Sequence, residues 1–310
     1  MKALVLKSTG NLYRLSTETG ELVQGRLAGK IRLDARKSTN PVVVGDQVEI
    51  VLDNNDALIT EIYPRKNYII RKSLNLSKQT HILAANLDQA ILLATLVAPR
   101  TSTGFIDRFL VTAEAYRIPA FIIFNKSDLL DKELKEVQDH YIKMYTDIGY
   151  KCFAISAYDK NDTDKVKKLL KDKITLLSGH SGTGKSTLVN AIEPGLDLKT
   201  GNISDVHLKG KHTTTFSELH KLAQGGYIID TPGIKELGLV EMKKEEVGHY
   251  FPEFRALMHE CRFNTCTHTH EPGCAVLKAL EEGKIHEERY HNYLGILQGD
   301  ETEWKEWESK

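Results

Sequence analysis

The chain has 310 residues, of which 41% are hydrophobic and 27% charged, as expected of a globular protein with two or three domains. Lys and Arg total 42, as do Asp and Glu, so the zero net charge excludes a strongly basic or acidic protein and indicates no class of partner. The longest apolar run, Ala90 to Ala98, is far short of the roughly 20 residues that span a bilayer, and the N-terminal segment lacks the apolar core of a signal peptide. We therefore expect a cytoplasmic protein with no membrane partner.

Residues 1–70 are predicted to form a small all-β domain. Short strand-like runs alternate there with turn-forming pairs such as Thr9-Gly10 and Asn40-Pro41. Such runs suit a closed β-barrel of the OB-fold, a frequent nucleic-acid-binding module, although an SH3-like barrel gives a similar pattern. The predicted strands are Ala3–Leu6, Asn11–Leu15, Glu21–Leu27, Val42–Leu52 and Ala57–Tyr63.

Basic residues cluster around one loop of this first domain. The phosphates of RNA attract such clusters, so the loop is a candidate RNA-contacting surface, but an exposed loop without a ligand explains the cluster equally well. The residues are Arg26, Lys30, Arg32, Arg36 and Lys37.

From Asp88 onward, strands alternate with helices, which predicts a mostly parallel sheet with helices on both faces. We assign residues 71–242 to this α/β domain. The segment Lys199–Thr215 is polar and contains glycine, so we expect a mobile loop there. The predicted strands are Gln89–Leu96, Ala120–Phe124, Lys151–Ile155, Ile174–Leu177, Ser217–Leu222 and Tyr227–Ile229, and the predicted helices are Gly104–Arg117, Leu130–Ile148, Asp162–Lys171 and Thr187–Ile192.

A phosphate-binding loop is predicted between the strand Ile174–Leu177 and the helix that begins at Thr187. Its sequence, Gly179-His180-Ser181-Gly182-Thr183-Gly184-Lys185-Ser186, matches G-x-x-x-x-G-K-[ST]. Glycines let backbone N–H groups surround the phosphates at the positive N-terminus of the helix. Lys185 can reach the β- and γ-phosphates, and Ser186 can place its hydroxyl on Mg²⁺. The sequence therefore predicts a nucleoside triphosphate site.

Asn125-Lys126-Ser127-Asp128 indicates that the base is guanine. It follows the predicted strand Ala120–Phe124, which places it at the carboxyl edge of the sheet, where ligands of such sheets bind. A carboxylate there can accept hydrogen bonds from N1 and the 2-amino group of guanine, which adenine cannot donate. Asn125 can brace the loop, and the stem of Lys126 can lie on the base. Ser156-Ala157, after the next strand, resembles the short element whose backbone N–H meets the guanine O6.

Two further segments suggest Mg²⁺ binding and a nucleotide-dependent switch. Asp230-Thr231-Pro232-Gly233 matches D-x-x-G, in which Asp230 would hold Mg²⁺ through water and the Gly233 N–H would meet the γ-phosphate. A threonine between this motif and the phosphate-binding loop should also bind Mg²⁺, and both Thr213 and Thr214 are candidates. The candidate GTP-binding residues are Asn125, Lys126, Ser127, Asp128, Ser156, Ala157, Gly179, His180, Ser181, Gly182, Thr183, Gly184, Lys185, Ser186, Thr187 and Gly233, and the candidate magnesium ligands are Ser186, Thr213, Thr214 and Asp230.

Hydrolysis needs a residue that orients the attacking water. Many GTPases place a Gln directly after D-x-x-G, but this chain has Ile234, which cannot hydrogen-bond to water. His212, beside the candidate threonines, can do so, and it is our candidate catalytic residue together with Lys185. The alternative for His212 is an ordinary histidine in a solvated basic loop.

The order of these motifs is unusual. They resemble those of the Ras-like (TRAFAC) GTPases, in which the phosphate-binding loop comes first and the two guanine-binding motifs come last. Here the guanine motifs at 125–128 and 156–157 precede the loop at 179–186, and D-x-x-G at 230–233 comes last. This is a circular permutation, which the sheet can survive because the site depends on where strand ends lie.

Residues 243–310 are predicted to form a helical zinc-binding domain. Cys261, Cys266, His268 and Cys274 offer three thiolates and an imidazole at close spacing, the ligand set of a closed structural Zn²⁺ site. His270 is a competing fourth ligand. Four protein ligands leave no open coordination position, so we expect one zinc ion that stabilises the fold.

The whole arrangement resembles the ribosome small subunit-dependent GTPase A family (RsgA, also called YjeQ). The resemblance rests on the barrel, the permuted motifs GHSGTGKS, GKHTTT and DTPG, and the Cys-x4-Cys-x-His-x5-Cys spacing. It implies an OB-fold, a permuted GTPase domain and a zinc domain. It also implies binding to the 30S subunit through rRNA, GTP hydrolysis stimulated by that subunit, and a role in late 30S maturation. In this family the residue matching His212 serves hydrolysis, and those matching the three cysteines and His268 bind zinc.

The preferred hypothesis is therefore an enzyme that binds GTP and GDP, contacts the 30S subunit and its rRNA, and acts as a monomer. The competing hypothesis is an RNA-binding scaffold whose nucleotide is structural. A GTPase acting on tRNA or at a membrane has no supporting motif.

Overall fold

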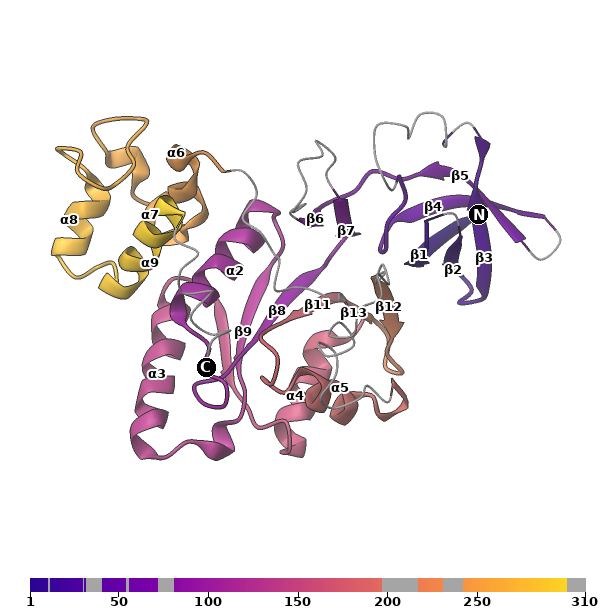
Figure 1. Cartoon of the computed structure of the whole chain (residues 1–310), viewed down its shortest axis with the longest axis horizontal. Coiled ribbons are helices and arrows are strands. Elements are labelled where there is room, and N and C mark those ends of the chain that lie inside the picture. Colours follow the sequence, from indigo (N-terminus) through magenta and orange to yellow (C-terminus); the bar gives the residue numbers. More distant parts are fainter. Residues whose placement is uncertain are drawn as a thin grey trace, which may run out of the picture.

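The computed structural model describes residues 1–10, 12–29, 31, 41–53, 56–71, 81–196, 217–230 and 242–299. Along the longest axis, a β-barrel and a group of short helices lie at opposite ends, and an α/β sheet lies between them (Figure 1). The predicted fold class is confirmed. None of the helices in these ranges is both long and apolar enough to cross a membrane.

The N-terminal barrel is OB-like. Its strands are β1 (Lys2–Ser8), β2 (Tyr13–Thr17), β3 (Leu22–Leu27), β4 (Gln47–Asp53) and β5 (Asp56–Ile62). β1, β2 and β3 are antiparallel neighbours, β3 pairs in parallel with β5, and β5 pairs with β4, which closes the barrel on β1. Alternate residues point inward, so Val5, Leu15 and Ile59 lie in a buried core.

The strand predicted at Val42–Leu52 is too long at its start. Gly45 has a φ of +88°, a left-handed conformation that interrupts an extended strand. The carboxylate of the buried Asp46 accepts a hydrogen bond from the Val43 N–H and pairs with Arg65. Residues 42–46 therefore form a turn, and the strand begins at Gln47.

A small hairpin joins the barrel to the central sheet. β6 (Tyr68–Arg71) and β7 (His81–Ala85) pair antiparallel in a sheet of their own, and sequence patterns did not indicate them. The hairpin straddles residue 70, the predicted end of the first domain. Ile69 and Ala84 pack into the same core as the central sheet.

The central sheet has the strand order β10-β9-β8-β11-β13-β12. All its pairs are parallel except β12 with β13. At its β12 edge the sheet continues into β1 of the barrel, where Glu218 pairs with Lys7. The strands are β8 (Gln89–Ala94), β9 (Ala120–Phe124), β10 (Lys151–Ala154), β11 (Ile174–Ser178), β12 (Glu218–Lys221) and β13 (Tyr227–Asp230).

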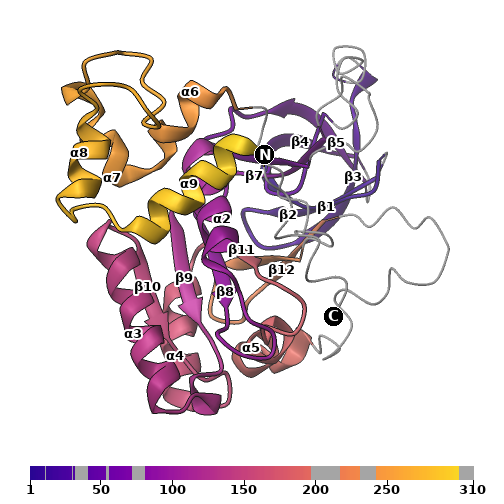
Figure 2. The ribbon, with the colours of Figure 1, turned by 60° about the vertical axis from the view of Figure 1, so that its left-hand side comes forward.

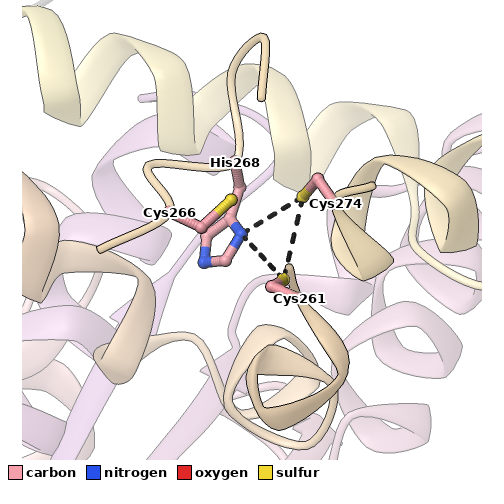
Figure 3. Close-up of side chains that lie close together, drawn as sticks. All are labelled: Cys261, Cys266, His268 and Cys274. Carbon is pink, nitrogen blue, oxygen red and sulfur yellow. Dashed lines mark hydrogen bonds between the residues drawn. The ribbon is translucent and has the colours of Figure 1, made fainter. Parts of the chain in front are cut away.

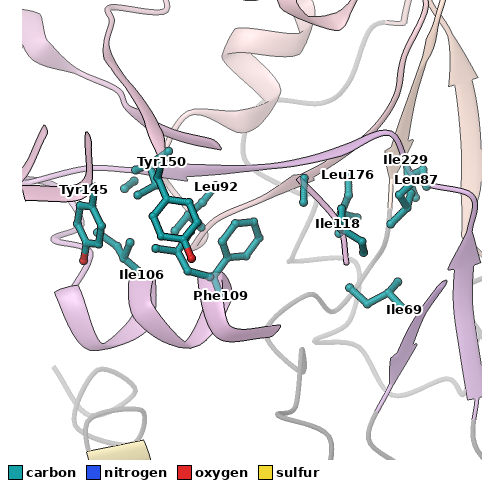
Figure 4. Close-up of a cluster of buried hydrophobic side chains, with 14 of the residues drawn as sticks. Ile69, Leu87, Leu92, Ile106, Phe109, Ile118, Tyr145, Tyr150, Leu176 and Ile229 are labelled. Carbon is teal, nitrogen blue, oxygen red and sulfur yellow. The ribbon is translucent and has the colours of Figure 1, made fainter. Parts of the chain in front are cut away.

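Helices cover both faces of this sheet. Alternate side chains of β8 point to opposite faces and all of them are buried, so each face must be covered by a layer of helices. Leu92 packs with Ile106 and Phe109 of α2 (Figure 4), whereas Ile91 and Leu93 pack with α4 and α5. The helices are α2 (Thr103–Ala115), α3 (Lys132–Asp147), α4 (Lys160–Leu170) and α5 (Lys185–Ile192).

Side-chain caps explain where three of these helices begin. The side chains of Ser102, Asp131 and Asp159 each accept a hydrogen bond from a backbone N–H of the first turn that follows. These bonds satisfy donors that a helix leaves unpaired at its start.

The C-terminal domain packs its short helices around Phe251, Phe254 and Tyr293. α9 lies along α2 of the central domain (Figure 2). The helices are α6 (Lys244–Val247), α7 (Pro252–Arg255), α8 (Ala275–Glu281) and α9 (Glu287–Gln298), and single 3-10 turns occur at Ser127–Leu129, Pro194–Leu196, Gly248–Tyr250 and Met258–Glu260.

Candidate functional site

The carboxyl ends of the parallel strands bring the predicted nucleotide motifs to one edge of the sheet. Asn125 directly follows β9, Gly179 directly follows β11, and Ser156 is the second residue after β10. β13, beside β11, ends at Asp230. Parallel strands end at a common edge, so motifs far apart in sequence share one site, as in other open α/β sheets.

Asn125 connects three of these motifs. Its Nδ2 donates a 2.8 Å hydrogen bond to the Thr183 carbonyl in the phosphate-binding loop. Its Oδ1 accepts a 3.0 Å bond from the Ala157 N–H, in the segment predicted to meet the guanine O6. The side chain is buried, so both bonds lie away from water. Asn125 therefore holds the two guanine motifs and the phosphate-binding loop together.

The phosphate-binding loop joins β11 to α5. Gly184, directly before the first residue of α5, has a φ of +92°, and a Cβ there would lie 2.4 Å from the Asn125 Nδ2. A side chain at this position would disrupt the bond between Asn125 and Thr183. The Lys185 ammonium donates to the carbonyls of Gly179 and His180, at 2.6 and 2.5 Å, so it lies over the loop. This position is compatible with the predicted role of Lys185 at the β- and γ-phosphates.

Hydrogen bonds to neighbouring backbone carbonyls hold the predicted guanine motif in place. Lys126 has a φ of +63°, and its ammonium donates to the Ala98 carbonyl. The Ser127 N–H donates to the carbonyl of Ile155, the residue after β10, which connects this loop to that strand. Asp128, predicted to bind the guanine base, is exposed to solvent.

Ser156 and the residues of α5 complete the predicted nucleotide site. The Ser156 N–H donates to the Asp162 carboxylate at 3.0 Å, which fixes the loop after β10. Ser186 and Thr187 lie in the first turn of α5, where N–H groups point toward the loop. His212, Thr213, Thr214 and Gly233 lie outside the described residues, as does the predicted mobile loop Lys199–Thr215.

The segment between β8 and α2 borders the site, and sequence reasoning missed it. A Cβ on Gly182 would lie 3.2 Å from the Pro99 ring, so this segment touches the phosphate-binding loop. The ring of Phe105, in the first turn of α2, lies 4.0 Å from the ring of His180. The sequence signal for this segment was Pro99, which lies three residues before Ser102, the cap of α2.

The second site lies in the C-terminal domain. One ligand atom from each of Cys261, Cys266, His268 and Cys274 lies within 4.8 Å of the other three (Figure 3). The His268 Nδ1 is 3.4 Å from the Cys274 sulfur and 3.7 Å from the Cys261 sulfur, and these two sulfurs are 4.0 Å apart. His270 is exposed, and its Nδ1 pairs with the Thr269 hydroxyl.

These distances fit a tetrahedral zinc ion. With Zn–S bonds of about 2.3 Å and a Zn–N bond of about 2.0 Å, two sulfurs lie about 3.8 Å apart, and sulfur and nitrogen about 3.5 Å. Burial raises the pKa of the Cys266 thiol to about 12, raises that of Cys274 and lowers that of His268. A divalent cation at their centre would stabilise the thiolates against this burial.

The loop between the ligands is held by its own hydrogen bonds. Tyr290 and Tyr293 of α9 donate to the carbonyls of His268 and Thr267. The Glu271 carboxylate accepts from the Thr267 hydroxyl and N–H and from the N–H groups of Thr269 and His270, which keeps the pKa of Glu271 low despite its burial. α9 therefore carries residues that support the cysteine cluster.

Comparisons with known proteins cover nearly the whole chain. A family model described as RsgA GTPase matches residues 62–240. The small ribosomal subunit biogenesis GTPase RsgA of Phocaeicola vulgatus is 55% identical over 302 residues, which cover 97% of each chain. YjeQ from Thermotoga maritima is 35% identical, and its crystal structure matches with a TM-score of 0.81 over 96% of this chain and 97% of that chain. YloQ, described as a circularly permuted GTPase, is 30% identical, with a TM-score of 0.76 over 96% and 94% of the two chains.

Proposed function

This chain belongs to the RsgA GTPase family, and we propose that it hydrolyses GTP on the small ribosomal subunit during late maturation of that particle. Its membership makes it a GTP hydrolase that uses Mg²⁺ with its nucleotide. The observation that carries the proposal is the Asn125 bridge, which joins the guanine motifs and the phosphate-binding loop into one site. The relatives' name, small ribosomal subunit biogenesis GTPase, supports the partner.

The nucleotide would lie along the carboxyl edge of the sheet. Asp128 would accept from the guanine N1 and 2-amino groups, and the Ala157 backbone would face O6. The loop 179–184 would surround the phosphates, with Lys185 against the β- and γ-phosphates. Ser186 and Asp230, with Thr213 or Thr214, would hold Mg²⁺, which screens the charge that develops on the phosphates.

The attacking water would be oriented by His212. Ile234 cannot hydrogen-bond, so the position after D-x-x-G offers no polar side chain for this role. We propose that the subunit accelerates hydrolysis by fixing His212 in place. A hydrogen-bond acceptor held in position restricts the attacking water to the orientation in which it can react.

The cysteine cluster would hold one structural zinc ion. The donor set and the interatomic distances support this assignment. The barrel would contact rRNA, which its OB-like fold supports.

The guanine site is tested with GDP and inosine diphosphate, which lacks the 2-amino group. Asp128→Ala should weaken GDP binding about tenfold to a hundredfold, the effect of losing hydrogen bonds to a charged group. It should weaken inosine diphosphate less, so that the two nucleotides bind alike. Asp131→Ala, which removes a helix cap nearby, is the matched control and should keep the preference for GDP.

The function is tested by GTP turnover with the protein alone, with 30S subunits and with 50S subunits. We expect strong stimulation by 30S alone, and loss of that stimulation in His212→Ala with GDP affinity retained. Equal slow rates in all three conditions would refute the proposed partner, and full stimulation of His212→Ala would refute the assigned catalytic residue.

A further inference from the structure

We propose that Glu288, in the C-terminal domain, is a positioning residue for the phosphate-binding loop, acting through Thr103 and the first turn of α2. This inference rests on the proposed function, because it assigns a regulator to the same nucleotide site. It links the position of the C-terminal domain to the rate at which nucleotide leaves.

α2 presents two different faces. Ile106, Phe109 and Leu110 pack onto the central sheet. The residues at the spacing of one and two helical turns from Thr103, namely Asp107 and Val111, face the C-terminal domain instead, and Val111 belongs to that domain's core. One helix is therefore shared by the sheet that forms the nucleotide site and by the domain that holds the cysteine cluster.

Glu288 meets this shared helix at its start. The Thr103 hydroxyl donates a 2.8 Å hydrogen bond to the Glu288 carboxylate. Glu288 also interacts with the buried Tyr141 of α3, as does Arg100 from the segment before α2; burial raises the pKa of Tyr141, and Glu288 adds to the rise while Arg100 opposes it. Glu288 thus contacts α2 and α3 at the end where the segment 97–102 borders the site.

The first turn of α2 touches the phosphate-binding loop. The Ser102 hydroxyl accepts from the Phe105 N–H at 3.2 Å, which fixes the position of Phe105 in this turn. The Phe105 ring then lies 4.0 Å from the His180 ring, at an angle of 32°. A displacement of Thr103 would move Phe105, and His180 would lose an aromatic contact that holds the loop.

Buried ion pairs of the neighbouring residue fix the position of Glu288 relative to α2. Its neighbour Arg289 pairs with Asp107 at 2.5 Å and with Glu253 at 2.8 Å, and Arg289 is only 1% exposed. Asn292 and Tyr145 donate further hydrogen bonds to Asp107. The register of α9 on α2 is therefore fixed one residue away from Glu288, so its carboxylate is held opposite Thr103.

The other end of α2 provides a matched control. There Arg255 of the C-terminal domain donates a 3.0 Å bond to Glu114. Both pairs join the same domain to the same helix, but Glu114 lies about two and a half turns from Phe105, given 3.6 residues per turn. If the domain merely braces the helix, breaking either pair should have the same effect; if Glu288 positions the loop, only the first pair should matter.

The experiment measures the dissociation rate of a fluorescent GDP analogue from the full-length, zinc-loaded protein without ribosomal subunits. Glu288→Ala and Thr103→Val should each release GDP about threefold to tenfold faster, the effect of one hydrogen bond, and the double variant should release it no faster than either. Glu288→Gln keeps an oxygen that accepts from Thr103, so it should restore the rate to within about twofold. Arg255→Ala should match the wild type.

Three results would overturn the proposal: unchanged rates in both Glu288→Ala and Thr103→Val, an equal acceleration in Arg255→Ala, or additive effects in the double variant. Thr103→Val lies outside the C-terminal domain, so it stays informative if Glu288→Ala loses zinc or misfolds. A wild-type protein that fails to bind GDP at all would instead refute the proposed function, which distinguishes the two failures.

Discussion

The central domain is joined to its two neighbours in different ways. Toward the barrel, the junction includes backbone pairing: the Ala85 N–H donates to the Val44 carbonyl, Val44 forms a parallel bridge with Ala84, and β1 pairs with β12. Toward the C-terminal domain, the contacts are between side chains, with Asp107, Arg289 and Glu253 buried together.

The difference concerns how far each junction depends on single residues. A backbone contact survives most substitutions, because every residue except proline offers the same N–H and C=O groups. A buried ion pair depends on both partners, and removal of one leaves an uncompensated charge. The barrel junction should therefore tolerate side-chain changes that the C-terminal junction does not, and the four predictions below test this from the largest expected effect to the smallest.

Removal of zinc should have the largest effect. Structural zinc contributes about 10–16 kcal/mol in small zinc-binding peptides, so Cys266→Ser or strong chelation should abolish cooperative unfolding of the C-terminal domain while the barrel stays folded. Zinc content by elemental analysis and domain-resolved hydrogen exchange measure this. Cys152→Ser, on β10, is the control and should keep its zinc. Retention of stoichiometric zinc by Cys266→Ser would contradict the assigned ligand set.

Arg289→Met should break the C-terminal junction. It leaves Asp107 buried without its cation, which costs about 3–5 kcal/mol for a buried ion pair. Urea unfolding followed by intrinsic fluorescence measures the loss. Lys284→Met removes an exposed cation of the same domain, which pairs with Glu282, and should cost less than about 1 kcal/mol. Similar losses in both variants would show that burial does not determine the strength of this junction.

Gly45→Ala should be the most damaging single change at the barrel junction. Gly45 has a φ of +88°, and a Cβ there would lie 2.1 Å from the Ala85 carbonyl oxygen. The backbone strain alone costs about 1–3 kcal/mol, and the clash adds to it. Gly10 has a similar φ of +82° with no atom within 4 Å of a Cβ, so Gly10→Ala should cost less by thermal unfolding. Equal costs would mean that the contact with Ala85 contributes nothing.

Glu218→Gln should have the smallest effect. Glu218 pairs with Lys7 and Arg14 where β12 meets β1, and both cations are at least partly exposed. Exposed ion pairs contribute about 0–1 kcal/mol, and salt screens them. The loss should be measurable at low salt and disappear at high salt in parallel unfolding curves. A loss that persists at high salt would indicate that these side chains, and not the backbone pairing, hold the barrel in place.

The meeting of the described nucleotide motifs at one edge of the sheet was predictable because their signals are local. The phosphate-binding loop and the guanine motif each follow a short apolar strand, and the carboxyl ends of parallel strands meet at one edge. The order of the motifs along the chain was therefore irrelevant to their assembly. The cysteine cluster was predictable for the same reason, because its residues span a short segment, and its geometry also separates His268 from the exposed His270.

The domain junctions were not predictable from the same patterns. Asp107 and Arg289 are 182 residues apart, and a charged residue on the polar face of an amphipathic helix normally lies in solvent. The β6–β7 hairpin has short strands separated by residues 72–80, too far apart for a tight-turn signal. The predicted start of a strand at Val42 was wrong, because the left-handed conformation of Gly45 interrupts the strand despite the β-branched residues before it.

The pairing of β12 with β1 also protects the chain from other copies of itself. An exposed edge strand has unpaired N–H and C=O groups that can pair with a strand of another molecule, which leads to edge-to-edge aggregation. The barrel occupies this edge of the central sheet, so strands from both domains form one sheet of eleven. Lys7 and Arg14 add positive charge beside Glu218 at the same place. A truncated chain that begins after the barrel should therefore lose solubility before it loses its nucleotide site.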